Sequence, residues 1–448
     1  MTWTRLLLVL GAGIYVGLLQ ILYPAIIVPA FGYAAMAYKA QSWMALLFQC
    51  GIAWLPSMWL PKTFNRPSQF QCWILYLTVV VPSCILPYHV TAKPGAWIHP
   101  FVLVIVLLFF ILCVATARPP RRFLRAALPL GWYAVLLGGI TLLTYGWLYA
   151  RLGLQSFFLP VEEVYNMRTA LRSAGTPALL GYLIWWQGGV VNPIISAMGF
   201  QRRQWLLVLL SVVLQVQLYS ITSLRTFLAA AAFQLGIGVF LVVVRRCRGM
   251  FLVHAMNLAV VLAAIWYFLD QRALGPLLLL DRWIFNGGQL SGLYLEFFTQ
   301  HPAAGMSHSA LPLLRVLLPG PYDLPIGQVI GRAYFILGTD GVYTNATAHF
   351  WADGFAIAGY VGMLVSTILA IGLLRLTDAV CRGLQTQLII MSFAIVGMSL
   401  IGQGVLTTVL TGGLAPFIAL MFLMPPLRSR HSPPKKHPVP ISCCESST

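Results

Sequence analysis

The chain has 448 residues, of which 59% are hydrophobic and only 8% are charged, and its formal net charge is +18. Soluble globular domains carry about 25% charged residues, so this composition excludes a soluble fold built around one apolar core. In a soluble protein the basic balance would indicate nucleic acid. In a membrane protein the positions of the basic residues indicate which loops face the cytoplasm, and no nucleic-acid partner is expected.

Twelve apolar segments follow one another along the chain, and most are close to the roughly 17–25 residues with which a helix crosses a bilayer. None shows the alternation of apolar and polar residues that is typical of membrane β-strands. We therefore predict an all-α, polytopic transmembrane protein with about 12 spans. The segments are 6–37, 42–60, 72–90, 97–117, 126–149, 177–199, 204–221, 226–244, 250–269, 352–374, 385–402 and 404–424.

The first apolar segment leaves the number of spans open between 11 and 13. It covers residues 6–37, which is longer than one span needs, and Pro24 and Pro29 interrupt it. It forms either one span with an extension along the interface or two spans. One span agrees better with the basic residues, because it keeps Arg5 on the side where most of them lie.

Basic residues set the predicted orientation, because cytoplasmic loops are enriched in Lys and Arg. With one span at 6–37, 18 of the 28 basic residues fall inside and 10 outside, so both termini are expected in the cytoplasm. Residues 1–424 then form a single transmembrane domain with two long periplasmic loops, 150–176 and 270–351. The second loop is expected to hold short helices along the membrane, and residues 425–448 to form a disordered cytoplasmic tail.

Acidic residues are rare and gather in the two outer loops and at their edges. Of the ten in the chain, only Asp378 and Glu445 are predicted to face the cytoplasm. Charged side chains at the edges of spans are costly and commonly functional, whereas mixed charges on a solvated loop are the alternative. The eight outer acids are Glu162, Glu163, Asp270, Asp281, Glu296, Asp323, Asp340 and Asp353.

Three arginines are notable for their position or spacing. Arg225 lies in ITSLRTFLAAA, between two apolar runs that almost no loop joins. It either anchors a helix end or points into a cavity at an anionic group. Arg168 and Arg172 are four residues apart and would share one helix face. Two cations at that spacing fit a pyrophosphate between them, or pairing with Glu162 and Glu163 on a solvated face.

Three histidines of the large loop, His301, His308 and His349, are candidate general bases, because imidazole titrates near neutral pH. The alternative is that a loop histidine is a bystander. Together with Asp353 these histidines match no zinc-binding spacing. We therefore expect neither a metal nor another cofactor.

Three blocks of polar and aromatic residues stand in order between about residues 161 and 363. They are VYNMRTALRSAG with LLGYLIWWQGGVVNPIISAMG, then SITSLRTFL, and then the loop pieces DRWIF, FFTQHPAAGMSHSAL, PYDLPIGQVIGRAYF and TNATAHFWADGFAIAGYVGML. This ordered set resembles the Wzy-type O-antigen polymerases, the oligosaccharide repeat-unit polymerases of bacterial inner membranes. The first 150 residues match only in hydropathy. Some relatives carry Lys where Arg225 stands, so the resemblance implies a cation there rather than a guanidinium fork.

The resemblance implies a metal-independent glycosyltransferase of O-antigen, capsule or exopolysaccharide synthesis. Such an enzyme transfers a glycan from undecaprenyl pyrophosphate to the nonreducing end of another lipid-linked repeat unit, at the periplasmic face of the inner membrane. The implied partners are the undecaprenyl-pyrophosphate-linked oligosaccharide and the lipid bilayer, with a chain-length regulator and a flippase as further candidates.

The implied chemistry requires cations for the leaving pyrophosphate and a base for the acceptor hydroxyl. His308 is the first candidate for the base and Asp353 is the second. The candidate substrate-binding residues are Arg168, Arg225 and Arg282 for the pyrophosphate, Arg172 and Arg332 as second choices, and Tyr322, Asn345, His349 and Trp351 for the rest of the substrate site.

Three other functions fit the same pattern. An O-antigen ligase uses the same donor and a similar architecture but a different acceptor, which the sequence does not name. A transporter or flippase for lipid-linked sugars predicts mid-span charges, of which this chain has almost none, or inverted repeats. A non-catalytic subunit of an envelope complex predicts that the outer Arg and His residues are dispensable.

Overall fold

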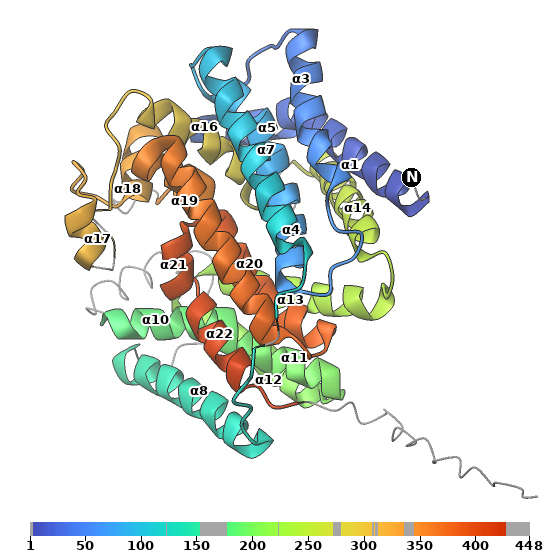
Figure 1. Ribbon diagram of the computed structural model, residues 1–448, viewed down its shortest axis with the longest axis vertical. Coiled ribbons are helices and arrows are strands. Elements are labelled where there is room, and N and C mark those ends of the chain that lie inside the picture. Colours follow the sequence, from blue (N-terminus) through green and yellow to red (C-terminus); the bar gives the residue numbers. More distant parts are fainter. Residues whose placement is uncertain are drawn as a thin grey trace, which may run out of the picture.

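Helices dominate the computed structural model (Figure 1). In the part of the chain that is described, all regular secondary structure is helical, and nine helices are long and apolar enough to cross a membrane. The chain is a multi-pass membrane protein. Most of the predicted loop 150–176 and of the predicted tail 425–448 lies outside the described part. The described residues are 3–121, 123–152, 177–222, 224–271, 279–306, 309, 312–335 and 345–426.

The helices occur in the following order. The α-helices are α1 (Trp3–Leu22), α2 (Val28–Phe31), α3 (Trp43–Trp54), α4 (Pro67–Leu75), α5 (Val81–Ile85), α6 (Pro87–Val90), α7 (Gly95–Ala117), α8 (Leu130–Leu152), α10 (Ala178–Trp186), α11 (Asn192–Arg202), α12 (Trp205–Thr222), α13 (Arg225–Val243), α14 (Arg248–Leu269), α16 (Asn286–Phe298), α17 (Pro312–Leu317), α18 (Ile326–Tyr334), α19 (Phe350–Cys381), α20 (Thr386–Gly402), α21 (Val405–Leu410) and α22 (Leu414–Leu423). Tighter and wider turns connect them: the 3-10 turns η2 (Gly32–Ala34) and η3 (Leu55–Met58), and the π-helical turns η1 (Tyr23–Ile27), η4 (Tyr76–Val80), η6 (Gln187–Val191) and η7 (Leu279–Phe285).

All twelve predicted apolar segments fold into helix. Segment 6–37 forms one candidate span, Trp3–Phe31, which agrees with one span there and not with two. Two further segments form shorter apolar helices, Trp43–Met58 and Thr386–Gly402. Segment 177–199 is built from α10, η6 and α11, which follow one another without a break.

Two of the π-helical turns have a cause in the sequence. η4 and η6 each end two residues before a proline, Pro82 and Pro193. Proline has no N–H, and its ring clashes with the carbonyl of the residue four positions earlier. Those earlier residues are Thr78 and Gly189, and both lie inside the π-helical turns. The wider turn moves their carbonyl groups away from the proline rings.

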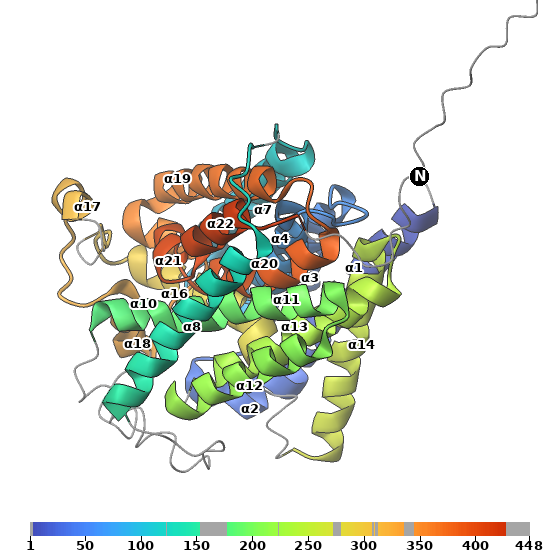
Figure 2. The ribbon, with the colours of Figure 1, turned by 90° about the horizontal axis from the view of Figure 1, so that it is seen from below.

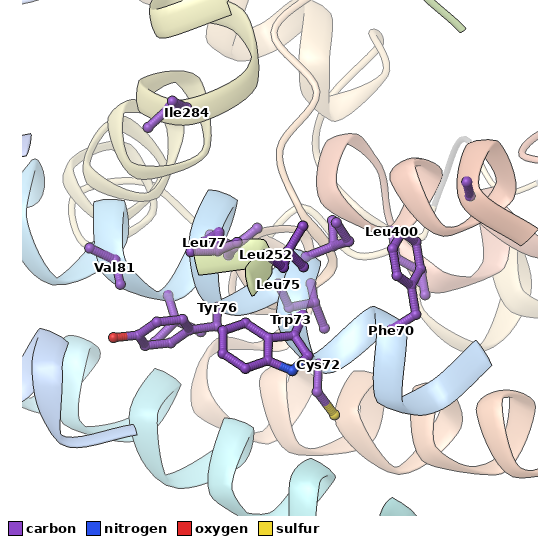
Figure 3. Packing of buried hydrophobic residues seen from close by; sticks show 14 of the residues in the cluster. Phe70, Cys72, Trp73, Leu75, Tyr76, Leu77, Val81, Leu252, Ile284 and Leu400 are labelled. Carbon is purple, nitrogen blue, oxygen red and sulfur yellow. The ribbon is translucent and has the colours of Figure 1, made fainter. Parts of the chain in front are cut away.

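The α4–η4–α5 column is the centre of the bundle. Residues 70–89 of the span Pro67–Val90, to which it belongs, are all buried within the protein, and the column packs against α3, α7, α16, α19 and α20. Figure 3 shows Leu75 and Leu77 of this column beside Leu252 of α14, and η4 also contacts η7. A helix that is apolar on all sides is expected in such a buried place.

Helix α16 departs from the expectation of short helices along the membrane surface. A Cβ atom at Gly287 would lie 2.6 Å from the carbonyl oxygen of Thr78, and one at Gly288 would lie 2.3 Å from that of Pro82. The two glycines therefore allow α16 to touch the backbone of the central column, and Ser291 hydrogen-bonds to Ser83 with 2.7 Å between their hydroxyl oxygens. This part of the predicted loop 270–351 is buried inside the bundle. α17 and α18 lie at the left edge of Figures 1 and 2, at what we call the loop end of the bundle.

A buried ion pair joins α4 and α19 at the other end of the bundle. Asp378 accepts from Arg66 Nη1 at 3.1 Å and from the hydroxyl and the backbone N–H of Ser68, at 2.6 Å and 3.0 Å. Arg66 also donates to the carbonyls of Thr116 and Ala117 at the end of α7. Asp378, which the sequence analysis assigned to the cytoplasmic side, therefore holds three helices together.

Replacing Asp378 with alanine should destabilise the protein, because it leaves the partly buried Arg66 guanidinium without a counter-charge. The expected loss is roughly 3–5 kcal/mol, measured as a lower unfolding midpoint of the purified protein in detergent. Asp323→Ala is the matched control, because Asp323 is an exposed aspartate. Equal midpoints for the two variants would contradict a structural role of the ion pair.

Candidate functional site

Helix α19 breaks near its N-terminus, at the loop end of the bundle. Ala358 (φ −154°, ψ 33°) and Gly359 (φ 60°, ψ −144°) leave the helical conformation, and the positive φ of Gly359 favours glycine. The carbonyl of Ala356, beside the break, accepts a hydrogen bond from the N–H of Ala304 at 2.7 Å. Because a broken helix frees backbone groups that lipid cannot satisfy, this bond stabilises the break and ties the large loop to α19.

A cavity of about 870 Å³ lies beside this break, between α18, the first half of α19 and α21. Three residues predicted from the sequence, Tyr322, Asn345 and Asp353, line it. Its lining also has an apolar part that includes Val361 and Val365, whose side chains are exposed. The cavity therefore combines a polar end with an exposed apolar lining.

Asp353 is the charged residue of the larger cavity. It lies in the first turn of α19, where the helix dipole favours a negative charge. The side chain is half-buried, and within the described part of the chain its carboxylate makes no hydrogen bond and no ion pair. A Cβ atom at Gly404 would lie 2.1 Å from Asp353 Oδ2. Glycine at position 404 is thus what leaves room for the carboxylate.

A second cavity of about 360 Å³ adjoins η7 and α16 and is lined by polar residues. Arg282 Nε lies 3.3 Å from Asp281 Oδ2, and the Arg282 side chain is 62% exposed. Burial raises the pKa of the Asp281 carboxyl, and the charge of Arg282 opposes that rise. Asn286, Gln289 and Asn345 complete the polar lining.

The two cavities share a wall. Asn345 and Thr347 line both of them. Gly402, the last residue of α20, lines the smaller cavity, and Gly404, directly before α21, lines the larger. The backbone of this wall is fixed by α18, since the N–H of Ala346 donates to the carbonyl of Gly327 at 2.8 Å. Arg282 and Asp353 therefore lie in neighbouring cavities on either side of one strip of chain.

His349 and Trp351, both predicted at the substrate site, lie in the interior and line neither cavity. Nδ1 of His349 accepts from the N–H of Ala352 at 3.4 Å, which assigns the proton to Nε2, and Nε2 donates to Ser291 Oγ at 2.6 Å. His349 is thus the N-cap of α19. The indole N–H of Trp351 donates to Thr367 Oγ1 at 2.9 Å, so both side chains serve packing and helix positioning.

The remaining predicted residues are spread over several places. Tyr322 donates its hydroxyl to the carbonyl of Pro302 at 2.8 Å. Arg332 is an exposed residue in the last turn of α18 and lines neither cavity. Arg225 is the first residue of α13, but its side chain is outside the described part. Arg168, Arg172 and His308 lie outside the described residues altogether.

Sequence reasoning missed several residues that line the cavities. Asp281 was noted as an outer acid and falls in the DRWIF block, but it was not assigned a role. Asn286, Gln289 and Gln403 also line the cavities. The uncharged amides Asn286 and Gln289 stand in a segment predicted to be a surface loop, where such side chains are common and do not indicate a binding site. In the described part no group of three His, Cys, Asp or Glu side chains could hold a metal, and the expectation of no metal stays a prediction.

His349 should make the stability of the protein depend on pH. Burial lowers its pKa from the ordinary 6.5 to about 3, so between these values the unfolded chain binds a proton that the folded chain does not. The contribution of His349 to stability therefore falls as the pH falls below 6.5, whereas the raised pKa of the Asp281 carboxyl acts in the opposite direction. The loss is on the order of 2 kcal/mol at about pH 5.

The unfolding midpoint in detergent, measured at about pH 7.5 and about pH 5, checks this. His349→Asn keeps a side chain that can cap α19 and should remove the His349 contribution, so that the midpoint of the wild type falls relative to that of the variant between about pH 7.5 and about pH 5. An unchanged pH slope in His349→Asn would show that another group is responsible.

Comparison of the chain with protein-family models, with curated proteins and with solved structures finds no match. A function must therefore be argued from the residues of the chain itself. The features that carry such an argument are the two adjoining cavities, with Asp353 in one and the Asp281–Arg282 pair in the other.

Proposed function

We propose that this protein is a glycosyltransferase that polymerises lipid-linked oligosaccharides. It transfers a glycan from undecaprenyl pyrophosphate to a hydroxyl of a second lipid-linked repeat unit, at the periplasmic face of a bacterial inner membrane. The loop end of the bundle, which carries both cavities, faces the periplasm in this proposal. The ordered sequence blocks and the polar cavities at that end support it.

The single observation that carries the proposal is the common wall of the two cavities. The transfer needs a base beside the acceptor hydroxyl and a cation beside the leaving group, with the reacting bond between them. Asp353 and Arg282 line neighbouring cavities that meet at Asn345 and Thr347. One cavity can therefore bind the donor and the other the acceptor, and the two substrates can react at the shared wall.

In the proposed reaction, the carboxylate of Asp353 takes the proton of the acceptor hydroxyl. The hydroxyl oxygen forms a bond to the anomeric carbon of the donor sugar. The bond between that carbon and the pyrophosphate oxygen breaks, and its electron pair leaves with the pyrophosphate. Arg282 stabilises the negative charge that develops there, in a role that Arg225 and the arginines of 150–176 would share.

The character of the larger cavity suits a lipid-linked substrate. Asp353, Asn345 and Tyr322 form the polar part of its lining, and Val361 and Val365 form an exposed apolar wall. A polyprenyl carrier is apolar and its glycan is polar, so an amphiphile of this kind can place each part in a matching environment. An enzyme for water-soluble sugars would not need the apolar wall.

A transporter for lipid-linked sugars is the second candidate, because interrupted helices are common in transporters. The break of α19 at Gly359 and the separation of α21 from α22 by Thr411–Gly413 are interruptions of this kind. Deleting the gene separates the candidates. A glycan ladder collapsed to one repeat unit supports the polymerase, polymer left on the lipid carrier supports a ligase, and repeat units trapped on the cytoplasmic side support a transporter.

Replacing Asp353 with asparagine should abolish polymerisation, because the variant keeps the shape of the side chain but cannot accept the proton. Removing a general base lowers the rate by roughly 10²- to 10⁴-fold. The measurement is the length distribution of surface glycan on a gel, with equal amounts of protein in the membrane. Asp323→Asn is the control and should give full-length chains. Full-length glycan from Asp353→Asn would remove Asp353 from the reaction.

A further inference from the structure

The smaller cavity has the features of a ligand site of its own. Its volume of about 360 Å³ is at the lower end of the roughly 300–1,000 Å³ of small-molecule sites. Polar side chains line it from η7 and α16 on one side and from Asn345 and Thr347 on the other. Phe31 and Phe335 add aromatic surface to the same lining. Polar groups combined with aromatic surface suit a ligand that has both hydroxyl groups and C–H faces.

Asp281 is the buried anion of this cavity. The residue is 7% exposed, and its Oδ2 atom pairs with Arg282 Nε. Within the described residues, the second oxygen, Oδ1, has no hydrogen-bond partner. The side chain is largely buried, but Oδ1 is not among the fully enclosed atoms that lack a partner. A charged carboxylate oxygen of this kind can accept a strong hydrogen bond from a ligand hydroxyl in the cavity.

Two amide side chains extend this set of polar groups. Gln289 is buried and donates through Nε2 to the carbonyl of Ala34, which leaves its carbonyl oxygen Oε1 as an acceptor. Asn286 is half-buried, and its side chain has no partner among the residues described. Acceptors thus predominate in the depth of the cavity, and the ligand that matches them is one that donates several hydrogen bonds.

Charge is distributed along the cavity in a definite order. The Asp281 side chain is 9% exposed, whereas the guanidinium-bearing side chain of Arg282 is 62% exposed. The anion is therefore deep and the cation is at the surface. A ligand with hydroxyl groups at one end and an anionic group at the other would match both.

We propose that the smaller cavity binds the donor sugar that is attached directly to the pyrophosphate, and that Asp281, Asn286 and Gln289 determine which sugar is accepted. The inference rests on the proposed function and deepens it. The pyrophosphate lies at Arg282, the sugar hydroxyls donate to Asp281 and Gln289, and the anomeric carbon lies toward the shared wall at Asn345.

A binding experiment with two lipids tests this site separately from catalysis. The probes are bare undecaprenyl pyrophosphate and undecaprenyl pyrophosphate carrying the first sugar of the native repeat unit. Their affinities are measured for the full-length protein in detergent. The wild type should bind the sugar-bearing lipid at least about tenfold more tightly, as expected for one or more added hydrogen bonds.

Asn286→Ala should remove this difference and leave the affinity for the bare lipid unchanged. Asp281→Asn should also remove the difference, but it takes away the counter-charge of Arg282 and should therefore tighten the binding of both lipids. Arg282→Gln should weaken the binding of both lipids, and Asp323→Asn, the matched control in the same loop region, should behave as the wild type. Asn286→Ala is the milder change, and it keeps the test valid if the buried Asp281→Asn variant fails to fold.

The outcomes separate this site from the proposed function. Equal affinity of the wild type for the two lipids, or an unchanged difference in Asn286→Ala, would overturn the sugar site even if Asp353→Asn is inactive. Full-length glycan from Asp353→Asn would overturn the catalytic proposal even if the sugar still improves binding.

Discussion

The structure around the candidate site depends on one backbone hydrogen bond, from the N–H of Ala304 to the carbonyl of Ala356. A membrane helix cannot leave backbone groups unsatisfied in lipid, yet α19 departs from helical geometry at Ala358 and Gly359. The segment before Ala304 comes from α16, which is anchored in the core. The bond therefore connects the buried part of the large loop to the break, and the larger cavity lies beside this junction.

Glycine makes the same region possible by letting backbones approach closely. A Cβ atom at Gly362 would lie 2.0 Å from the carbonyl oxygen of Gly354, so the two parts of α19 can touch only because both are glycines. Gly404 leaves room for the Asp353 carboxylate, and Gly327 for Asn345, whose Oδ1 atom would lie 2.3 Å from a Cβ there. Small neighbours thus leave room for Asp353 and Asn345, whereas Asp281 is paired with Arg282.

Much of the fold could be predicted from hydropathy, because the length of an apolar segment is set by the thickness of the bilayer. All twelve segments became helices, whereas the burial of α16 could not be foreseen, since its polar residues Asn286, Gln289 and Ser291 resemble those of a surface loop. The partner of Asp378 is Arg66, 312 residues away in the sequence, and no local pattern contains that contact.

The site was predicted in part, and the differences have a physical cause. Asp353 and Asn345 were identified from the blocks around them, and both line the larger cavity. His349 and Trp351 stand in the same block, but α19 turns them into the core, because adjacent residues of a helix face different directions. Asp281 became a candidate only once η7 had placed it beside Asn286 and Gln289.

The central claim is that the two adjoining cavities hold a lipid-linked donor and an acceptor for direct glycan transfer. The most direct measurement is chain elongation by the purified wild-type protein in liposomes, with the native lipid-linked repeat unit as donor and acceptor and no other protein. We expect lipid-linked glycans of increasing length together with released undecaprenyl pyrophosphate. Substrate that is bound, or moved across the bilayer, without any lengthening would contradict it.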